Sequence, residues 1–166
     1  RMNRTYTQNQ FLNLVDDIRL FMPDCAISTD IIVGFPGETE DEFEETLNVV
    51  KQVAFDSAFM FKYSSRPGTK AAEYDDHIDE ETKQNRLLKL IDLQRKITLK
   101  RNKDRIGTIQ KVIVEKESKK SPHQWAGRTN GNTWVIFDKT DEKIKDMVTV
   151  MITDTKGVTL FGQRAN

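Results

Sequence analysis

The fold of this chain is decided by one stretch near its start, Ile27-Ser28-Thr29-Asp30-Ile31-Ile32-Val33-Gly34-Phe35-Pro36-Gly37-Glu38-Thr39. Residues 26 to 33 form an almost continuous run of apolar and β-branched residues, which predicts a strand that is buried on both faces. The turn Gly34 to Gly37 ends this strand. Thr39 and Glu42 have the spacing of a capping box, which predicts that a helix begins there. The stretch therefore predicts the strand, loop and helix of a βα unit.

The same order of elements continues on both sides of this stretch. Upstream, Thr7 and Gln10 have capping-box spacing and predict a helix that ends at Pro23. Downstream, a strand is predicted from 57 to 63, and it runs into the loop Arg66-Pro67-Gly68-Thr69. Two strands cannot close a sheet, so we expect residues 1 to about 75 to belong to a larger α/β barrel or open sheet. The abrupt start at Arg1 favours a fragment, and we expect either upstream residues or a partner chain to cover the open sheet edge at residues 26–33.

A long helix is predicted to begin at Asp79 and to end before Gly107, which stands where a C-cap glycine would. Its last turns are strongly basic. Its apolar positions recur at helical period and are expected to pack the helix against the preceding βα layer. These positions are Leu87, Leu88, Leu90, Ile91, Leu93 and Ile97. We expect this helix to close a first domain that covers residues 1–106.

After Gly107 the apolar period changes from that of a helix to that of short strands. Five strands are predicted, at 108–116, 124–129, 133–137, 147–154 and 158–162, and they suggest a small five-stranded antiparallel β-barrel over residues 107–166. Asn130-Gly131 predicts a type I′ turn between the second and third strands, because both residues tolerate positive φ. The polar segment 117–123 is expected to be a mobile loop.

Composition excludes some classes of function. Charged residues make up 31% of the chain and hydrophobic residues 37%, and no apolar run could cross a bilayer, so we expect a cytoplasmic protein without a membrane partner. The lone cysteine, Cys25, and two isolated histidines, His77 and His123, suggest neither a metal site nor a catalytic residue. From Gly107 on there are ten basic and seven acidic residues, a net charge of +3. The preceding part carries −3.

Two places could bind a ligand. The first is the end of each predicted strand, where Ile32, Val33 and Gly34 could meet a flat ring, because ligands of parallel α/β folds lie beyond the carboxyl ends of strands. A plainer interpretation is that the glycines only form tight turns. The second place is the predicted β-barrel, which combines aromatic and basic residues as RNA-binding barrels do. The alternative there is that Trp125, Trp134 and Phe161 fill the interior of the barrel.

The stretch quoted above resembles the radical S-adenosylmethionine methylthiotransferases, and especially those that act on tRNA. The resemblance continues in Phe61-Lys62-Tyr63-Ser64-Ser65-Arg66-Pro67-Gly68-Thr69-Lys70-Ala71-Ala72, and residues 108–162 resemble the TRAM domain that ends members of this family. The implied fold is α/β plus all-β. The last strands and helices of a radical-SAM (β/α) barrel, a partial barrel here, are followed by a TRAM barrel.

The resemblance also implies an activity, with its cofactors and partners. Such enzymes add a methylthio group to the isopentenyl-modified adenosine next to the tRNA anticodon, using S-adenosylmethionine and two [4Fe-4S] clusters. Each cluster needs three cysteines, and this chain has one, so the chain alone should be inactive. The expected partners are the tRNA anticodon stem-loop and the N-terminal portion of the same protein.

The resemblance, together with the composition of the predicted β-barrel, leads us to expect two sites. For S-adenosylmethionine they are Ile32, Val33, Gly34, Phe61 and Tyr63, although Asp30 stands where the family motif usually begins with glycine. For RNA, we expect contacts from Lys119, Lys120, Arg128 and Trp134.

Two other functions fit the same sequence. A methylthiotransferase of this architecture could act on a ribosomal protein, and the barrel would then bind protein. Alternatively, the chain could be a free-standing RNA-binding adaptor with no enzymatic parent. A CxxxCxxC motif upstream would exclude the adaptor.

Overall fold

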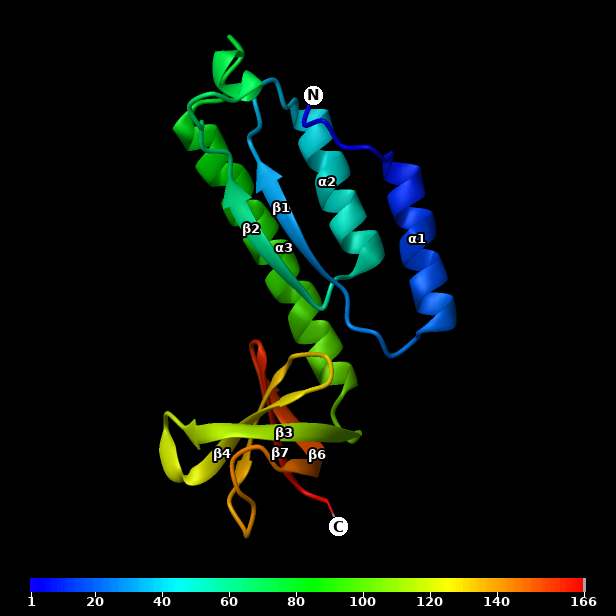
Figure 1. Cartoon of the computed structure of the whole chain (residues 1–166), viewed down its shortest axis with the longest axis vertical. Helices are drawn as coiled ribbons and strands as arrows, with labels where there is room; N and C mark the ends of the chain where they lie inside the picture. Colours follow the sequence, from blue (N-terminus) through cyan, green and yellow to red (C-terminus); the bar gives the residue numbers. More distant parts are fainter. Residues whose placement is uncertain (166) are drawn as a thin grey trace. The chain divides into compact units, whose positions relative to one another are not determined.

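In a computed structural model, which describes residues 1–165, the chain forms two compact units, the first from Arg1 to Gln94 and the second from Arg95 on. Figure 1 shows the order of their elements. The helices are α1 (Gln8–Phe21), α2 (Glu40–Val53), the short 3-10 helix η1 (Lys70–Glu73) and α3 (Glu80–Asp104). The strands are β1 (Ser28–Val33), β2 (Ser57–Lys62), β3 (Ile109–Ser118), β4 (Ser121–Thr129), β5 (Trp134–Asp138), β6 (Met147–Lys156) and β7 (Thr159–Arg164). The boundary predicted at residues 106 and 107 stays a prediction.

The helices begin where the capping signals predict. The Thr7 side chain accepts a hydrogen bond from the backbone N–H of Gln10, whose side chain accepts one from the backbone N–H of Thr7. Thr39 and Glu42 form the same reciprocal pair at the start of α2. At the start of α3, Asp79 Oδ1 accepts from the backbone N–H of Thr82 at 2.8 Å. Each of these bonds satisfies a donor that an uncapped helix would leave unpaired.

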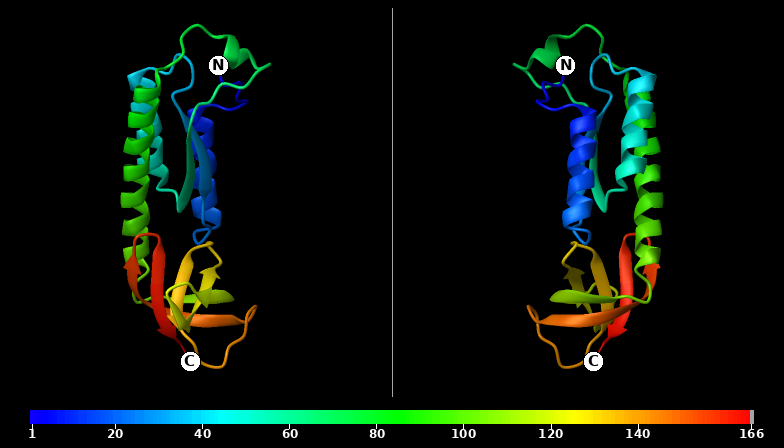
Figure 2. Two further views of the ribbon diagram at one scale, coloured as in Figure 1. Left: turned by 90° about the vertical axis from the view of Figure 1, so that its left-hand side faces the viewer. Right: turned by 90° about the vertical axis from the view of Figure 1, so that its right-hand side faces the viewer.

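The first unit contains the predicted βα arrangement. Strands β1 and β2 pair in parallel, from Ser28 opposite Ser57 to Val33 opposite Lys62. In both views of Figure 2, helices α2 and α3 lie on the same side of these strands. The core on that side includes Val33, Phe43 and Val50, each exposed by 1% or less.

The prediction that the first strand is buried on both faces is wrong for the described chain. Ile32 is 38% exposed, and Phe59 and Phe61 on β2 are 62% and 52% exposed. Successive side chains of a strand point to opposite faces, and helices of this unit cover only one face. The other face is an apolar surface.

The buried face of α3 differs from the predicted apolar stripe. Of the six predicted positions only Leu90 is fully buried, whereas Leu88 is 53% exposed. The neighbouring buried positions are polar, namely Lys83, Arg86 and Gln94. Hydrogen bonds explain the difference, because Gln94 Nε2 donates to the carbonyl of Phe55 at 2.9 Å and buried polar groups are tolerated when they are paired. In the described part of the chain, no helix is long and apolar enough to span a bilayer.

The second unit contains a closed five-stranded barrel in the order β3-β4-β5-β7-β6. All five predicted strands are present. Their inward side chains form one core, with Trp125 packed against it: Val112, Val114, Val135, Phe137, Val148, Val150, Ile152 and Leu160.

The barrel is mixed and not antiparallel as predicted. Strands β5 and β7 run parallel, with Val135 opposite Leu160, while every other pair is antiparallel. The reason is geometric, since an odd number of strands in a closed ring cannot alternate in direction all the way round. One parallel pair is therefore required.

Two local predictions in this unit are also wrong. The segment 117–123 is not a mobile loop, because β3 and β4 continue through it until Ser118 pairs with Ser121 and leaves Lys119-Lys120 as the turn. The register shifts in β3 allow the two strands to stay paired. The connection at Asn130-Gly131 is not a two-residue type I′ turn. Thr129 N–H donates to the Thr133 carbonyl, and Asn132 takes the positive φ of 60°.

The loop after β1 requires glycine at position 34. Gly34 has a φ of +72°, and a Cβ placed there would lie 2.4 Å from Lys83 Cγ. Gly68 has a similar φ of +79°, but a Cβ there would have no neighbour within 4 Å. Comparing substitutions at the two positions therefore distinguishes the cost of backbone strain from the cost of steric overlap.

We expect Gly34→Ala to destabilise the first unit by about 2–4 kcal/mol, because left-handed strain and overpacking add. Gly68→Ala should cause only the strain, about 1–2 kcal/mol. Urea unfolding followed by the helix signal in circular dichroism measures both. Equal losses for the two variants would contradict the role of Lys83.

A buried carboxylate holds the β5–β6 connection to β7. Glu142 Oε1 accepts from the Thr140 hydroxyl at 2.6 Å and from Arg164 Nε at 3.1 Å, and Oε2 accepts from the Thr140 backbone N–H at 2.9 Å. Burial by itself would raise the pKa of Glu142, but the Thr140 hydrogen bonds together with Arg164 outweigh it, so the pKa lies below its usual value.

The stability of the barrel should therefore depend on the charge of Glu142. A carboxylate whose pKa is lowered by folding stabilises the native state above its unfolded pKa of about 4.3, and this contribution disappears as the pH falls through the folded pKa. We expect Glu142→Gln to destabilise the barrel by about 1–3 kcal/mol at neutral pH, because the amide NH₂ faces a donor. Tryptophan fluorescence reports barrel unfolding, since both tryptophans lie in the barrel. The difference in the free energy of unfolding between the unmodified protein and the Glu142→Gln variant should shrink in acid. A difference that does not depend on pH would refute this explanation.

Candidate functional site

A cavity of about 440 Å³ opens on the second unit, on the outer face of β4, β5 and β7. We call it the lysine groove. Four of the described residues that line it are lysines and none is acidic, so the groove suits an anionic ligand. The lining residues are Lys116, Ser118, Lys119, Lys120, Gln124, Ala126, Trp134, Ile136, Lys156, Thr159 and Phe161.

Strand alternation and register build the floor of this groove. Val135 and Phe137 point into the barrel core. Trp134 and Ile136 alternate with them along β5 and therefore point outward. Ile136 is the register partner of Ala126 on β4 and of Phe161 on β7. These three residues therefore form an apolar row across three strands.

The two tryptophans have different positions. Trp125 packs against the barrel core, as the alternative interpretation of the aromatic residues expects. Trp134 and Phe161 line the outer groove instead. The aromatic residues are thus divided between the interior and the surface of the barrel.

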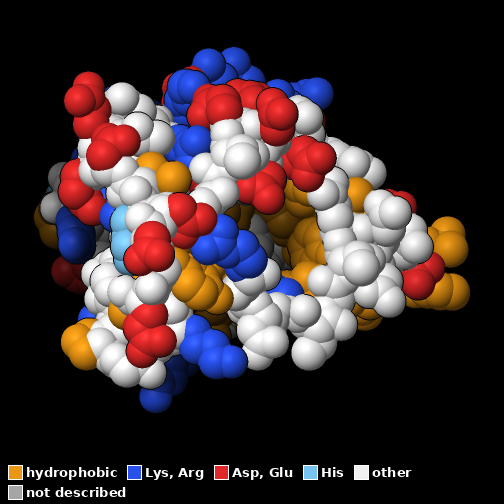
Figure 3. Space-filling view, turned by 90° about the horizontal axis from the view of Figure 1, so that it is seen from above, with side chains coloured by type: hydrophobic (Ala, Val, Ile, Leu, Met, Phe, Trp, Pro, Cys, Tyr) orange, Lys and Arg blue, Asp and Glu red, His pale blue; other side chains and the backbone are white. Residues whose placement is uncertain are grey.

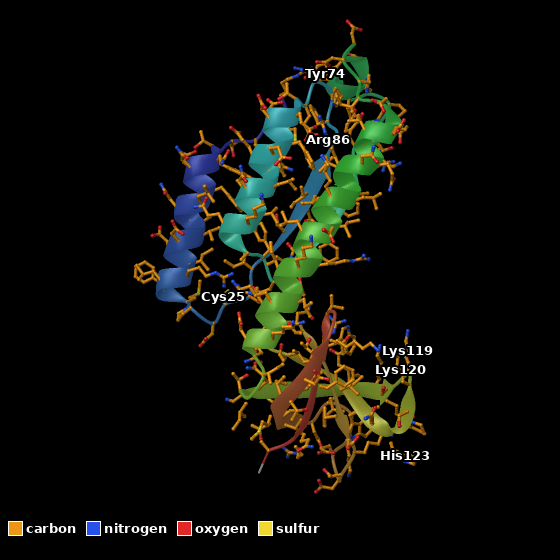
Figure 4. The ribbon with its side chains drawn as sticks, turned by 180° about the vertical axis from the view of Figure 1, so that it is seen from behind. Cys25, Tyr74, Arg86, Lys119, Lys120 and His123 are labelled. Carbon is orange, nitrogen blue, oxygen red and sulfur yellow. The ribbon has the colours of Figure 1, made fainter. Side chains whose placement is uncertain are left out.

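The lysines reach the groove from two hairpins. Lys119 and Lys120 form the β3–β4 turn and lie next to each other in Figure 4. Lys156 is the last residue of β6, at the β6–β7 hairpin. All three are exposed and available to a ligand.

Arg128, which we also predicted to contact RNA, does not line the groove. Its guanidinium carbon lies 4.2 Å from the centre of the Trp134 ring, and its Nε is 3.5 Å from Glu115 Oε1. It also donates to the side-chain oxygen of Asn132. Lys116 Nζ lies 4.5 Å from the centre of the same Trp134 ring. Arg128 is thus occupied by contacts within the chain.

The residues predicted to contact S-adenosylmethionine lie at the carboxyl ends of β1 and β2, but they do not form one cluster. Ile32 and Phe61 are register partners on the exposed face of the sheet. Val33 is fully buried, so its side chain cannot touch a ligand. Figure 3, which looks onto this end of the strands, shows hydrophobic side chains inside a hollow, with charged side chains along part of its rim.

Tyr63 belongs to a second group at this end. Its ring packs edge-on against Phe35 at 5.2 Å, and Lys83 Nζ lies 5.8 Å from its centre. Its hydroxyl is buried and has no hydrogen-bond partner among residues 1–165. A buried hydroxyl without a partner is unfavourable, so a ligand that supplied a hydrogen bond would be stabilised there.

A buried ion-pair network fixes the Gly34 loop. Glu38 Oε2 accepts from the backbone N–H of Gly34 and from Arg86 Nη1, each at 2.7 Å. Arg86 lies between α3 and α2 in Figure 4, and its Nη2 is 3.1 Å from Glu40 Oε2. Hydrogen bonds from Arg86 and then from Lys89 hold the pKa of Glu40 below its usual value. Helix α3 thereby sets the conformation of the loop.

The described residues cannot hold an iron–sulfur cluster. Residues 1–165 contain no group of three histidine, cysteine, aspartate or glutamate side chains that could bind a metal ion. The one cysteine, Cys25, is exposed and lies in the connection between α1 and β1, as Figure 4 shows. A [4Fe-4S] cluster needs several thiolates, so cluster chemistry does not fit these residues.

Sequence analysis missed seven residues of the lysine groove: Lys116, Ser118, Gln124, Ala126, Ile136, Lys156 and Thr159. The alternation of Trp134 and Ile136 with buried residues was a signal that both point outward. The register of β7 beside β5 was not visible in the sequence, because it joins strands that are not neighbours along the chain.

Comparison with known proteins agrees with this geometry. Residues 103–164 match the TRAM domain family. The chain is also similar to proteins named tRNA-2-methylthio-N(6)-dimethylallyladenosine synthase. The protein from Christiangramia forsetii is 43% identical over 98% of this chain and 34% of the relative. The one from Natranaerobius thermophilus is 45% identical over 98% and 36%, and the one from Porphyromonas gingivalis is 46% identical over 98% and 35%.

The chain therefore spans about a third of the length of the curated relatives that it matches. The matched part includes both units, and the resemblance stated from the sequence is confirmed. Residues 103–164 match the TRAM domain family, and the chain as a whole is similar, over 98% of its length, to the C-terminal third of proteins named tRNA-2-methylthio-N(6)-dimethylallyladenosine synthase.

Proposed function

We propose that this chain is the C-terminal part of a cytoplasmic enzyme that adds a methylthio group to the isopentenyl-modified adenosine next to the tRNA anticodon. In this proposal the second unit binds the anticodon stem-loop. The observation that carries it is the lysine groove, which lies on a TRAM barrel in a chain that resembles tRNA-modifying enzymes. A surface lined by lysines without a carboxylate suits a polyanion better than a protein, which favours tRNA over a ribosomal protein.

Phosphate contacts would supply most of the affinity. Lys119, Lys120 and Lys156 are exposed on two hairpins around one groove, so they can meet successive phosphates of one strand. Each neutralised phosphate releases counterions, and binding then weakens as salt rises. This interface does not depend on Arg128, which lies outside the lining of the groove and contacts Glu115 and Trp134 within the chain.

The first unit would form the last strands and helices of a radical-SAM (β/α) barrel. The exposed Ile32 and Phe61 would flank the adenine of S-adenosylmethionine, and the backbone of Gly34 would approach it closely. The unpaired hydroxyl of Tyr63 would supply a polar contact nearby. Val33 would contribute only its backbone. When bound, S-adenosylmethionine supplies the radical chemistry of such an enzyme.

The two [4Fe-4S] clusters of the whole enzyme would have to be held by residues outside this chain. Its single cysteine is too few for either cluster. We therefore propose that the chain by itself is inactive and that it works with the N-terminal portion of the same protein, which would also cover the apolar face around Phe59.

We expect the 166-residue chain to bind an anticodon stem-loop RNA with an affinity that falls steeply between low and moderate salt. The double variant Lys119→Ala/Lys120→Ala should weaken binding at low salt by roughly tenfold or more and should reduce the salt slope by about 1–2. Fluorescence anisotropy of a labelled stem-loop measures both quantities. The matched control is Lys111→Ala/Lys143→Ala, which removes two exposed lysines outside the groove. If both double variants bind alike, the groove is not the RNA site.

We expect tRNA from cells that lack the gene for the whole protein to retain isopentenyl adenosine without its methylthio group. Mass spectrometry of tRNA nucleosides detects the difference. The complete gene should restore the modification, and a gene with Lys119→Ala/Lys120→Ala should restore it only in part. Unchanged tRNA, together with an altered ribosomal protein, would overturn the proposal.

A further inference from the structure

We propose that the lysine groove seats one unpaired RNA base, turned out of its stack and placed on the Phe161 ring, while the lysines hold the flanking phosphates. This inference rests on the proposed RNA binding and adds to it what the groove recognises. The ligand would be a single-stranded segment, not a duplex.

The floor of the groove is apolar in a way that phosphate binding does not require. Ala126, Ile136 and Phe161 form a row across three neighbouring strands, through direct register pairs. The small side chain of Ala126 leaves depth at one end of this row, and Phe161 provides a ring at the other. A surface that bound only phosphates would require no more than lysines. This row adds an apolar surface that can contact a flat, weakly polar group.

The size and surroundings of the groove fit a base. Its volume of about 440 Å³ lies in the range of sites for small organic ligands. Ser118, Gln124 and Thr159 add polar side chains to the lining. The lysines come from the β3–β4 and β6–β7 hairpins. A nucleotide combines an apolar ring face, a polar edge and a charged phosphate, and these three features match the lining.

Phe161, and not Trp134, is the available stacking surface. The cations of Lys116 and Arg128 lie 4.5 Å and 4.2 Å from the centre of the Trp134 ring, so this ring already makes two cation–π contacts within the chain. Across residues 1–165 no such ring or cation contact involves Phe161. The Trp134 ring is thus in contact with Lys116, which also lines the groove.

A base in this groove implies a preference for unpaired RNA. In a duplex each base is stacked and paired, and its ring face cannot reach a protein side chain without unstacking. A single strand can offer its bases freely, and stacking on an aromatic side chain tolerates any base. The groove would therefore bind unpaired RNA loops in preference to RNA duplexes, without discriminating between base sequences.

The experiment compares three probes on the 166-residue chain by fluorescence anisotropy. They are a short single-stranded RNA, the same RNA annealed to its complement, and a sugar–phosphate strand of the same length without bases. The unmodified chain should bind the single strand best. Phe161→Ala should weaken binding of the single strand by roughly 5- to 100-fold and leave binding of the abasic strand unchanged. Lys119→Ala/Lys120→Ala should weaken binding of both.

Two further variants keep the test informative if Phe161→Ala disturbs the barrel. Phe161→Tyr keeps the ring and should retain the affinity for the single strand. Met147→Ala removes an apolar side chain that is 64% exposed on β6, outside the groove, and should change nothing. Tryptophan fluorescence verifies that each variant is folded.

The results separate this inference from the proposed function. If Phe161→Ala binds all three probes like the unmodified chain, or if the duplex binds as tightly as the single strand, the base site is refuted. RNA binding through the lysines survives that result provided that Lys119→Ala/Lys120→Ala still weakens it. If no probe binds even at low salt, the proposed function fails, and the base site fails with it.

Discussion

The parallel pairing of β5 with β7 is the contact on which the candidate RNA site depends. A ring of five strands can close only if one neighbouring pair runs parallel, and in this barrel that pair brings Phe161 next to Ile136. The same closure places the β6–β7 hairpin, and Lys156 with it, at the groove that the β3–β4 hairpin reaches from the other side. Closing the barrel thus assembles an apolar floor and a basic rim from strands far apart in the sequence.

The first unit depends on a different interaction, the buried pair of Arg86 and Glu38. Glu38 Oε2 accepts a hydrogen bond from the backbone N–H of Gly34 and another from Arg86 Nη1, each at 2.7 Å. Breaking such a pair would leave a buried charge without its partner, which is strongly unfavourable. The loop that follows β1 is therefore fixed by a helix that comes almost fifty residues later. A fixed loop at the carboxyl end of parallel strands is what a ligand site in an α/β fold needs.

Much of the fold could be predicted from local signals, because these signals act over a few residues. The capping boxes at Thr7 and Thr39 set the starts of two helices, and alternating apolar residues set the five strands of the second unit. The predictions were wrong where contacts with residues distant in the sequence determine which side chains are buried. Of the apolar stripe predicted on α3 only Leu90 is fully buried, and Arg86 and Gln94 are buried beside it because ion pairs and a hydrogen bond satisfy their polar groups.

The sequence by itself determined the two-part organisation, the βα order, the β-rich second unit and the resemblance to tRNA-modifying enzymes, since these follow from local pattern and from motif residues such as Gly34. It also predicted Lys119 and Lys120 as RNA contacts, and in the structure both residues line the lysine groove. Only the tertiary structure decided that Lys116 and Arg128 lie against the Trp134 ring, and that the Phe161 ring lines the groove without a ring or cation contact from residues 1–165. The physical reason is strand register, which joins residues across the barrel and leaves no trace in the spacing of either strand.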